Sequence, residues 1–371
     1  MESGAQVLAV NDDLPVRSRE PVHSGKVRAV YWLTAEDSAR LIAERAYAVS
    51  ADAQLGIMVI SDRLSAFDCL WRAEGGLVGV PGKGAALNAI AAHWFQRFAA
   101  AGLARSHLLE TPHPLLWVVQ RARPLAIEAI ARRYLTGSLA RAYAAGDREF
   151  CGIRLPDGLV AEQRLPELLV TPSTKGVLRG LAGVPEADDV NVSAAQLRRH
   201  QSAFGFRRAA DLARYERLLR EGFALIEAEL ASLDLLFVDT KFEFGYGDNR
   251  AGEGELLYLD EVGTPDSSRI WDGVAYRRGR VVEFSKERFR QSLLAAVPDP
   301  TVLLNQGRMG ERRRLARDWV VPRPVFDALA ESYADLARRL TGRPPGAVGQ
   351  PREELCAVLG DELGVLDTAR C

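Results

Sequence analysis

Residues 236–245 read "LFVDTKFEFG", an apolar start followed by strict alternation of charged and apolar or hydroxyl side chains. If this segment is a strand, successive side chains point to opposite faces, so Asp239, Lys241 and Glu243 share one face. A strand that begins as a buried apolar run and then presents acid, base and acid on one side has two interpretations. The charged face is either the solvent-exposed side of an amphipathic hairpin or part of the lining of a charged binding site.

The second strand of this hairpin carries more charge. "ELLYLDEVGTPDSSR" (255–269) follows the turn-like "YGDNRAGEG" and adds Asp260, Glu261, Asp266 and Arg269. Both strands open with apolar runs typical of buried strands, and buried carboxylates must be paired or bind cations. Carboxylates on adjacent strands beside a lysine have the chemistry that a Mg²⁺–triphosphate requires. The residues alone leave the structural and the functional interpretations equally open.

Composition narrows the class of protein. The chain has 371 residues, a net charge of -1 and 47% hydrophobic residues, enough for one large domain or two joined lobes. The near-neutral charge argues against a protein that grips nucleic acid or an anionic membrane. No apolar run approaches the roughly 20 residues that span a bilayer, and the N-terminus does not resemble a secretion signal. Four widely spaced cysteines favour a reducing cytoplasm over a zinc site or a disulfide framework.

The order of predicted elements indicates an α+β enzyme of two lobes with a cleft between them. Residues 1–20 are expected to be a flexible leader, 21–125 a β-rich nucleotide-binding lobe, and 126–371 a larger α+β lobe. Helices are expected over 81–102, ending at Gly102, and over 194–232. Residues 151–193 are expected to form an extended loop, and the chain from 285 onward is expected to be mostly helical.

Several shorter segments have polar residues where a site could form. "SGKVRAVY" (24–31) places Lys26 and Arg28 on one strand face after a glycine, and "RRYLTGS" (132–138) adds Arg132 and Ser138. "SDRLSAFD" (61–68) and "TPSTK" (171–175) are polar turns that capping explains equally well. No G-x-x-x-x-G-K-[ST] loop, G-x-S-x-G elbow or histidine cluster is present.

Taken in order, seven segments resemble the SAICAR synthetase family: "GKVRAVY", "SDRLSAFD", "PGKG", "RRYLTGS", "TPSTK", "DTKFEFG" and "DEVGTPDSSRIWD". The resemblance implies a two-lobed, kinase-like ATP-binding fold. It also implies ATP-dependent amide formation in purine biosynthesis, in which the carboxylate of a carboxyaminoimidazole ribonucleotide is phosphorylated and then attacked by the amine of L-aspartate. The expected cofactors are ATP and Mg²⁺, and the expected partners are these small molecules, in a monomer or homo-oligomer.

The resemblance also implies roles for individual residues. Lys26, Arg28 and Lys241 match ATP-binding positions, Lys241 and Asp239 the catalytic pair, and Glu243 and Asp260 the magnesium-binding acids. The remaining matches bind substrate, and they are Arg132, Ser138, Asp189, Asp266, Ser268 and Arg269.

The chain departs from the family pattern near the substrates. Ala29 stands where Asp is usual, Arg133 where Gly is usual, and Gly263 where Leu is common. Asp188 stands in for a histidine before Asp189, the loop over 176–193 is longer, and "SKERFRQSLL" lacks a usual tryptophan. These departures raise a second hypothesis, a ligase acting on another acid or amine in specialised metabolism. A third is a silent nucleotide-binding scaffold, against which the intact Lys241, Glu243 and Asp260 argue.

Overall fold

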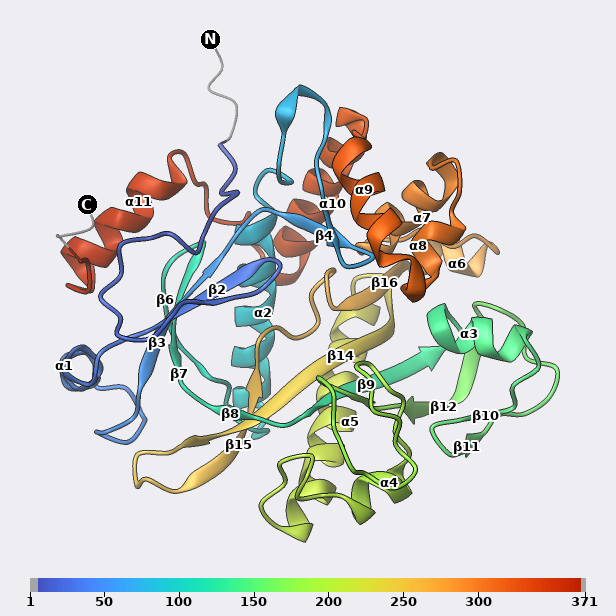
Figure 1. Ribbon diagram of the computed structural model, residues 1–371, viewed down its shortest axis with the longest axis horizontal. Helices are drawn as coiled ribbons and strands as arrows, with labels where there is room; N and C mark the ends of the chain where they lie inside the picture. The colour runs from blue at the N-terminus through green and yellow to red at the C-terminus, as the bar shows by residue number, and fades with distance from the viewer. Residues whose placement is uncertain (1–5, 368–371) are drawn as a thin grey trace.

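The computed structural model describes residues 6–367 and places two antiparallel sheets side by side, each carrying its own helices (Figure 1). The first sheet has five strands in the order β1-β2-β3-β7-β6: β1 His23–Ser24, β2 Arg28–Trp32, β3 Leu55–Ile60, β7 Leu116–Gln120 and β6 Leu108–His113. The second has seven: β8 Arg123–Pro124, β9 Ile127–Tyr134, β12 Arg164–Val170, β13 Ser173–Thr174, β14 Leu235–Asp248, β15 Gly254–Leu259 and β16 Ser268–Asp272. Short hairpins β4 Leu64–Ala66 with β5 Cys69–Trp71, and β10 Glu149–Phe150 with β11 Ile153–Arg154, complete the strands.

The expected first helix is α2 (Lys83–Ala100), which packs against both sheets: Phe95 contacts Trp117 of β7, and Phe98 contacts Phe242 of β14 and Tyr258 of β15. Its apolar side chains recur at helical spacing, and Trp94 and Phe98 are fully buried. Gly102 follows the helix with φ +72°, a left-handed conformation that glycine adopts without strain, so the expected stop is confirmed.

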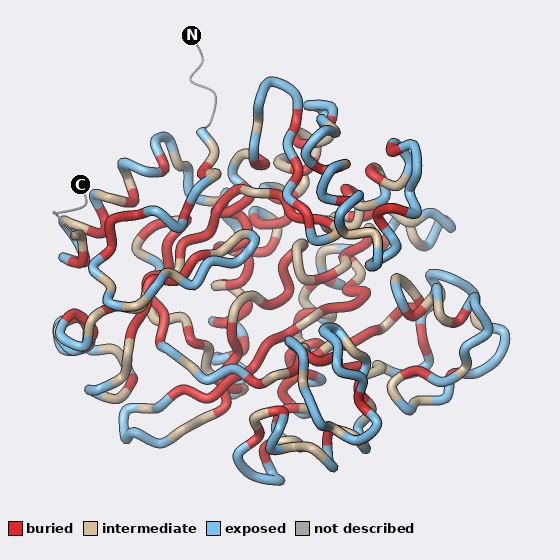
Figure 2. Tube along the Cα trace, in the orientation of Figure 1, coloured by how far each residue is buried: buried red, intermediate tan, exposed pale blue. Residues whose placement is uncertain are grey.

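Strand β14 is the centre of the second sheet and pairs with β8, β9, β15 and β16. On its inner face Phe242 and Phe244 are buried and pack against Tyr258 of β15. Helix α5 (Ala209–Ala231) packs against β14, and this apolar contact holds the strand in place. Figure 2 shows buried chain running through the middle of both sheets, with exposed chain in loops, on outer helix faces and in strands such as β1 and β8.

Three expectations about the elements were wrong. The helix expected over 194–232 is two helices, α4 (Ala194–Arg199) and α5, because the chain between them turns at Gly205 (φ +94°) to bury Phe204 and Phe206. No helix was expected before residue 81, yet the chain forms helix α1 (Ala35–Arg45), which is capped by Thr34. The expected loop 151–193 includes β12, which pairs with β9.

The C-terminal third is mostly helical, as expected: α6 Gly273–Arg277, α7 Glu287–Ala296, α8 Thr301–Leu304, α9 Met309–Asp318, α10 Arg323–Thr341 and α11 Pro351–Ala357. Helix α10 packs against α2, and α11 lies beside the first sheet (Figure 1). Arg352 of α11 pairs with Asp13 at 2.7 Å, so the end of the chain does not stay within the expected second lobe.

Residues 6–20 differ from the expected flexible leader, whose first five residues lie outside the described part of the chain. Leu8 and Leu14 are buried in the core, and the Leu8 backbone N–H donates to Asp62 Oδ2 at 2.8 Å. Val16 forms a bridge with Leu366, so this segment is packed between the first sheet and the chain end. None of the helices within residues 6–367 is both long and apolar enough to cross a membrane.

Candidate active site

A pocket of about 1390 Å³ lies where the two sheets meet. The first lobe contributes residues of β2 and the β4–β5 hairpin, and the second contributes β14, the segment after β15, and the start of α7. The connection between the lobes, residues 120–124, lines one end. The pocket therefore joins groups that lie more than 200 residues apart in the sequence.

The charged face of β14 lines this pocket. Asp239, Lys241 and Glu243 all face it, whereas Phe242 and Phe244 pack into the core on the opposite side. The alternation in the sequence predicted this division of faces. The interpretation of this charged face as the solvent-exposed side of a hairpin was wrong, because Asp239 and Glu243 are buried.

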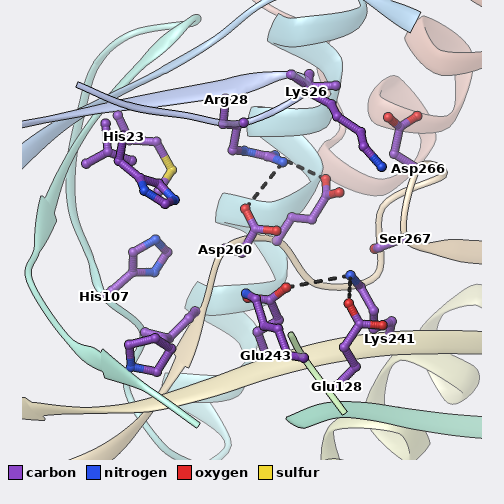
Figure 3. A pocket seen from close by; sticks show the side chains of 18 of the residues that line it. His23, Lys26, Arg28, His107, Glu128, Lys241, Glu243, Asp260, Asp266 and Ser267 are labelled. Carbon is purple, nitrogen blue, oxygen red and sulfur yellow. Dashed lines mark hydrogen bonds and ion pairs between the residues drawn. The ribbon is translucent and has the colours of Figure 1, made fainter. Parts of the chain in front are cut away.

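Lys241 lies between two carboxylates (Figure 3). Its Nζ is 2.7 Å from Glu128 Oε1 and 3.6 Å from Glu243 Oε1. Burial works against the charged form, but Glu128 and Glu243 together hold the pKa of this ammonium above its ordinary value. Lys241 is therefore positively charged at neutral pH. Lys175, from the "TPSTK" segment, forms a second ion pair with Glu243.

Arg28 and Lys26 approach from the first lobe. The Arg28 guanidinium lies 3.1 Å from Glu261 Oε2 and 3.5 Å from Asp260 Oδ1 (Figure 3). Burial opposes its charge, yet Glu261 and Asp260 keep the pKa of Arg28 above its ordinary value. Lys26 pairs with Asp68 at the corner of the β4–β5 hairpin. Lys26 and Arg28, near the start of β2, thus face the charged side of β14 across the pocket.

Glu243 and Asp260 are neighbours across the β14–β15 ladder. Glu243 is in register with Leu259, the residue before Asp260, and both carboxylates line the pocket. Within residues 6–367 no cluster of three or more metal-ligating side chains occurs. Mg²⁺ is commonly bound through one or two carboxylates together with substrate phosphates and waters. This donor set therefore fits a magnesium ion that arrives with a nucleotide.

A second group of cations lies at the other end of β14. Arg269 donates to Asp239 Oδ2 at 2.6 Å and to Glu287 Oε2 at 3.0 Å. Arg132 is buried 3.7 Å from Asp239 and donates to Ser138 Oγ at 3.3 Å. Arg132 and Ser138 thus lie beside the pocket wall, whereas Asp239, Ser268 and Arg269 line it.

Gly137 explains how helix α3 (Gly137–Ala144) comes so close to this group. Its φ is +59°, and a Cβ here would lie 2.9 Å from a guanidinium nitrogen of Arg269. Only glycine allows both the backbone conformation and the approach.

The two remaining expected residues, Asp266 and Asp189, also line the pocket. Asp266 is enclosed by cations, with Lys83 Nζ 3.0 Å and Lys286 Nζ 3.2 Å from its Oδ2. Burial would raise its pKa, but these lysines hold the pKa of Asp266 far below the usual range. Asp189 lies on the loop after β13 with φ +55°, and burial together with Asp188 raises the pKa of its carboxyl.

Sequence reasoning did not assign several groups that the structure brings to the site: Lys83, Glu128, Lys175, Glu261, Lys286 and Arg290. One feature of the sequence could have identified three of them, the lysines. The chain has only five lysines among its 48 basic residues, at positions 26, 83, 175, 241 and 286. Four line the pocket, and the fifth binds Asp266, which also lines it.

Comparison with known proteins gives a consistent result. A family model described as SAICAR synthetase matches residues 21–299. The phosphoribosylaminoimidazole-succinocarboxamide synthase of Aeromonas salmonicida is 60% identical over 367 residues, which cover 99% of this chain and all of that protein. The protein of the same name from Vibrio cholerae is 58% identical over equal shares.

Solved structures agree in fold. A SAICAR synthase from Saccharomyces cerevisiae complexed with SAICAR matches with a TM-score of 0.62 at 24% identity, covering 87% of this chain and 95% of that one. A type-2 SAICAR synthetase in complex with ADP matches with a TM-score of 0.55 at 18% identity, covering 88% and 99%. The expected α+β fold class is thereby confirmed.

Proposed function

This chain belongs to the SAICAR synthetase family, and from that premise we propose how its pocket carries out the reaction. It is an ATP-dependent ligase of purine biosynthesis, which joins the carboxylate of carboxyaminoimidazole ribonucleotide to the amine of L-aspartate. Identity of about 60% along the whole chain does not favour the alternative of another acid or amine in specialised metabolism. The departures in the 176–193 loop fall inside the region aligned with these relatives.

The nucleotide phosphates bind, in this proposal, between Lys26 and Arg28 on one side and Lys241 on the other. All three side chains line the pocket, and Arg28 and Lys241 stay cationic beside their carboxylate partners. The family relative that was solved with ADP supports nucleotide use. A triphosphate entering here would exchange protein carboxylates for phosphate oxygens as the partners of these cations.

Glu243 and Asp260 would hold Mg²⁺ on the phosphates. The ion supplies charge neutralisation during phosphoryl transfer when it is bound. Lys175 and Arg28, which now pair with these two carboxylates, would be freed to contact phosphate oxygens.

The imidazole ribonucleotide binds at the other end of β14. Arg132, Ser138 and Arg269 would hold its phosphate, because two guanidinium groups and a hydroxyl converge beside Gly137. Asp239 orients both arginines, since its carboxylate lies between them. Ser268 and Asp189 also line the pocket and would contact the base.

One observation carries this arrangement: Asp239, Lys241 and Glu243 lie in a row on one strand face, with Lys241 in the middle. A carboxylate is a poor electrophile until one of its oxygens becomes part of a phosphate leaving group. Lys241 lies between the proposed ribonucleotide and magnesium ends, where it would stabilise charge that develops on the transferring phosphoryl group.

ADP release measured with carboxyaminoimidazole ribonucleotide and a panel of amines tests the function. We expect release with L-aspartate and much less with L-alanine or L-glutamate at equal concentration. Release with another amine and none with L-aspartate would overturn the assignment. A cytoplasmic location is proposed on the same grounds, as the setting of purine biosynthesis.

A further inference from the structure

The distribution of lysines is the starting observation. Nine of the chain's 48 basic residues line the pocket, so a random placement of five lysines would put about one there. Four line it instead, and Lys83 is bound to a residue that does. Basic side chains elsewhere in the chain are arginine without exception. The lysines are therefore concentrated at the pocket, where the compact ammonium of lysine and the planar guanidinium of arginine are not interchangeable.

Three of the lysines already have a role in the proposed function. In that proposal Lys26 and Lys241 bind the nucleotide phosphates, and Lys175 pairs with Glu243, one of the two carboxylates that would hold magnesium. Lys83 and Lys286 do not. They meet at Asp266, which is buried and which also accepts a hydrogen bond of 2.7 Å from the Tyr333 hydroxyl.

This cluster has an excess of positive charge. Two ammonium groups share one carboxylate oxygen, and Lys83 is fully buried. Arg290, one helical turn from Lys286 and also on the pocket wall, adds another cation, whose nearest acid Glu287 is shared with Arg269. Burial lowers the pKa of Lys286, and repulsion from Arg290 and Lys83 adds to the effect, although Asp266 and Glu261 oppose it. An anion bound beside Lys286 and Arg290 would relieve this excess.

The reaction has anions that still lack a site. The triphosphate and the ribonucleotide phosphate are accounted for by other cations, whereas the two carboxylates of L-aspartate are not. We propose that Lys286 and Arg290 bind a carboxylate of the amino-acid substrate, and that Lys83, Asp266 and Tyr333 are positioning residues that hold Lys286 in place. This inference rests on the proposed function and adds a binding site for its second substrate.

The backbone fixes this subsite next to the reacting end of the pocket. The Lys286 N–H donates to the Pro265 carbonyl at 2.8 Å, which ties the start of α7 to the turn before Ser267 and Ser268. Ser267 accepts the backbone N–H of Lys241 through its carbonyl oxygen at 3.1 Å. The subsite and Lys241 are therefore connected through one short turn, which brings a bound amino acid close to the acyl group.

Differential amine labelling tests the site without any mutation, because the chain offers only five lysines and its N-terminal amine. The protein is treated with an amine-acylating reagent alone, with succinate, or with ATP and Mg²⁺, and labelling at each lysine is measured by mass spectrometry. We expect succinate, a dicarboxylate without an amine, to protect Lys286 at least threefold and to leave Lys26 unchanged. Protection of Lys26 and not Lys286 by succinate would overturn the proposal.

Kinetics of Lys286→Met provide the second test. We expect the KM for L-aspartate to rise about tenfold to a hundredfold, the range for loss of a charge-assisted hydrogen bond, with the KM values for ATP and ribonucleotide within threefold of wild type. Hydroxylamine, which has no carboxylate, traps the acyl phosphate: its N–C bond forms, the C–O bond to phosphate breaks, and the proton passes to solvent. Its rate of ADP release should be unchanged in the variant.

The controls separate this proposal from the function it rests on. Arg288→Met, on the exposed face of the same helix, should leave all three KM values unchanged. Equal loss of aspartate and hydroxylamine turnover in Lys286→Met would overturn the subsite while leaving the ligase function intact. Failure of wild-type protein to release ADP with L-aspartate would instead refute the proposed function. If Lys286→Met does not fold, Lys286→Arg, which keeps the charge, should still raise the KM for L-aspartate alone, and an unchanged value would count against the site.

Discussion

Replacing Lys241 by methionine removes the charge at the middle of the β14 face and keeps a side chain of similar length. The ammonium lies within 2.7 to 3.6 Å of two carboxylate oxygens, and a phosphoryl oxygen that replaced one of them would lie at a similar distance. At about 4 Å and an effective dielectric constant near 20, one charge pair is worth about 4 kcal/mol. Removing a single preorganised donor from an active site typically costs about 2.7–4 kcal/mol, or about 10²–10³ in kcat. We therefore expect kcat to fall by about 10²–10³.

The assay is ADP release under saturating ATP, ribonucleotide and L-aspartate, with thermal unfolding as the measure of fold. Glu243 keeps Lys175 as a partner, but Glu128 loses its ion-pair partner, so the variant should unfold at a slightly lower temperature and still fold. Lys241→Arg, which keeps the charge, should be less impaired than Lys241→Met. A folded Lys241→Met enzyme with kcat within fivefold of wild type would refute the role given to this ammonium.

Three further predictions follow from neighbouring contacts. Asp260→Asn should raise the Mg²⁺ concentration needed for half-maximal ADP release at least tenfold. The control Asp248→Asn, seven residues beyond Lys241 on the same strand, should not change it. Equal Mg²⁺ titrations of the two variants would show that Asp260 does not bind the metal. Gly137→Ala should raise the KM for the ribonucleotide about tenfold, since its Cβ would meet Arg269 and its φ is +59°, and an unchanged KM would contradict the close approach. Burial lowers the pKa of His107 to about 4, below its unfolded value of about 6.5. Between these two pH values the unfolded state binds more protons than the folded state, so the free energy of unfolding falls as the pH drops from about 6.5 towards 4. In denaturant titrations, the free energy of unfolding should fall by about 2 kcal/mol less between pH 7 and pH 5 in His107→Gln than in wild type. An unaltered pH dependence would show that His107 is not the titrating group.

The β14 strand shows why much of the site could be predicted. Alternation along "DTKFEFG" fixes which side chains share a face, because the period of a strand is two whatever the tertiary structure. That face became informative only together with "GKVRAVY" and "TPDSSR", whose cations meet it from elsewhere in the chain. The order of such segments, rather than any one of them, indicated the family.

The site residues that the sequence did not reveal, and the helix that was wrongly predicted as continuous, have a different physical origin. Glu128 is one acid in "RPLAIEAIARRYL", and nothing local indicates that β9 places it against Lys241. Lys83 lies in the first turn of a helix and Lys286 before another, and only the packing of α2, α7 and α10 around Asp266 brings them together. The break between α4 and α5 arises because tertiary burial of Phe204 and Phe206 outweighs a continuous helical pattern. Long-range packing of this kind leaves no periodic trace in the sequence.

A crystal structure with ADP, Mg²⁺ and the succinocarboxamide product would show directly which groups the β14 face binds. We expect Lys241 Nζ to leave Glu128 and contact a nucleotide phosphate oxygen, with Glu243 and Asp260 on the metal and the ribonucleotide phosphate beside Arg269. A complex in which Lys241 still pairs with Glu128 and the product lies away from the β14 face would contradict this expectation.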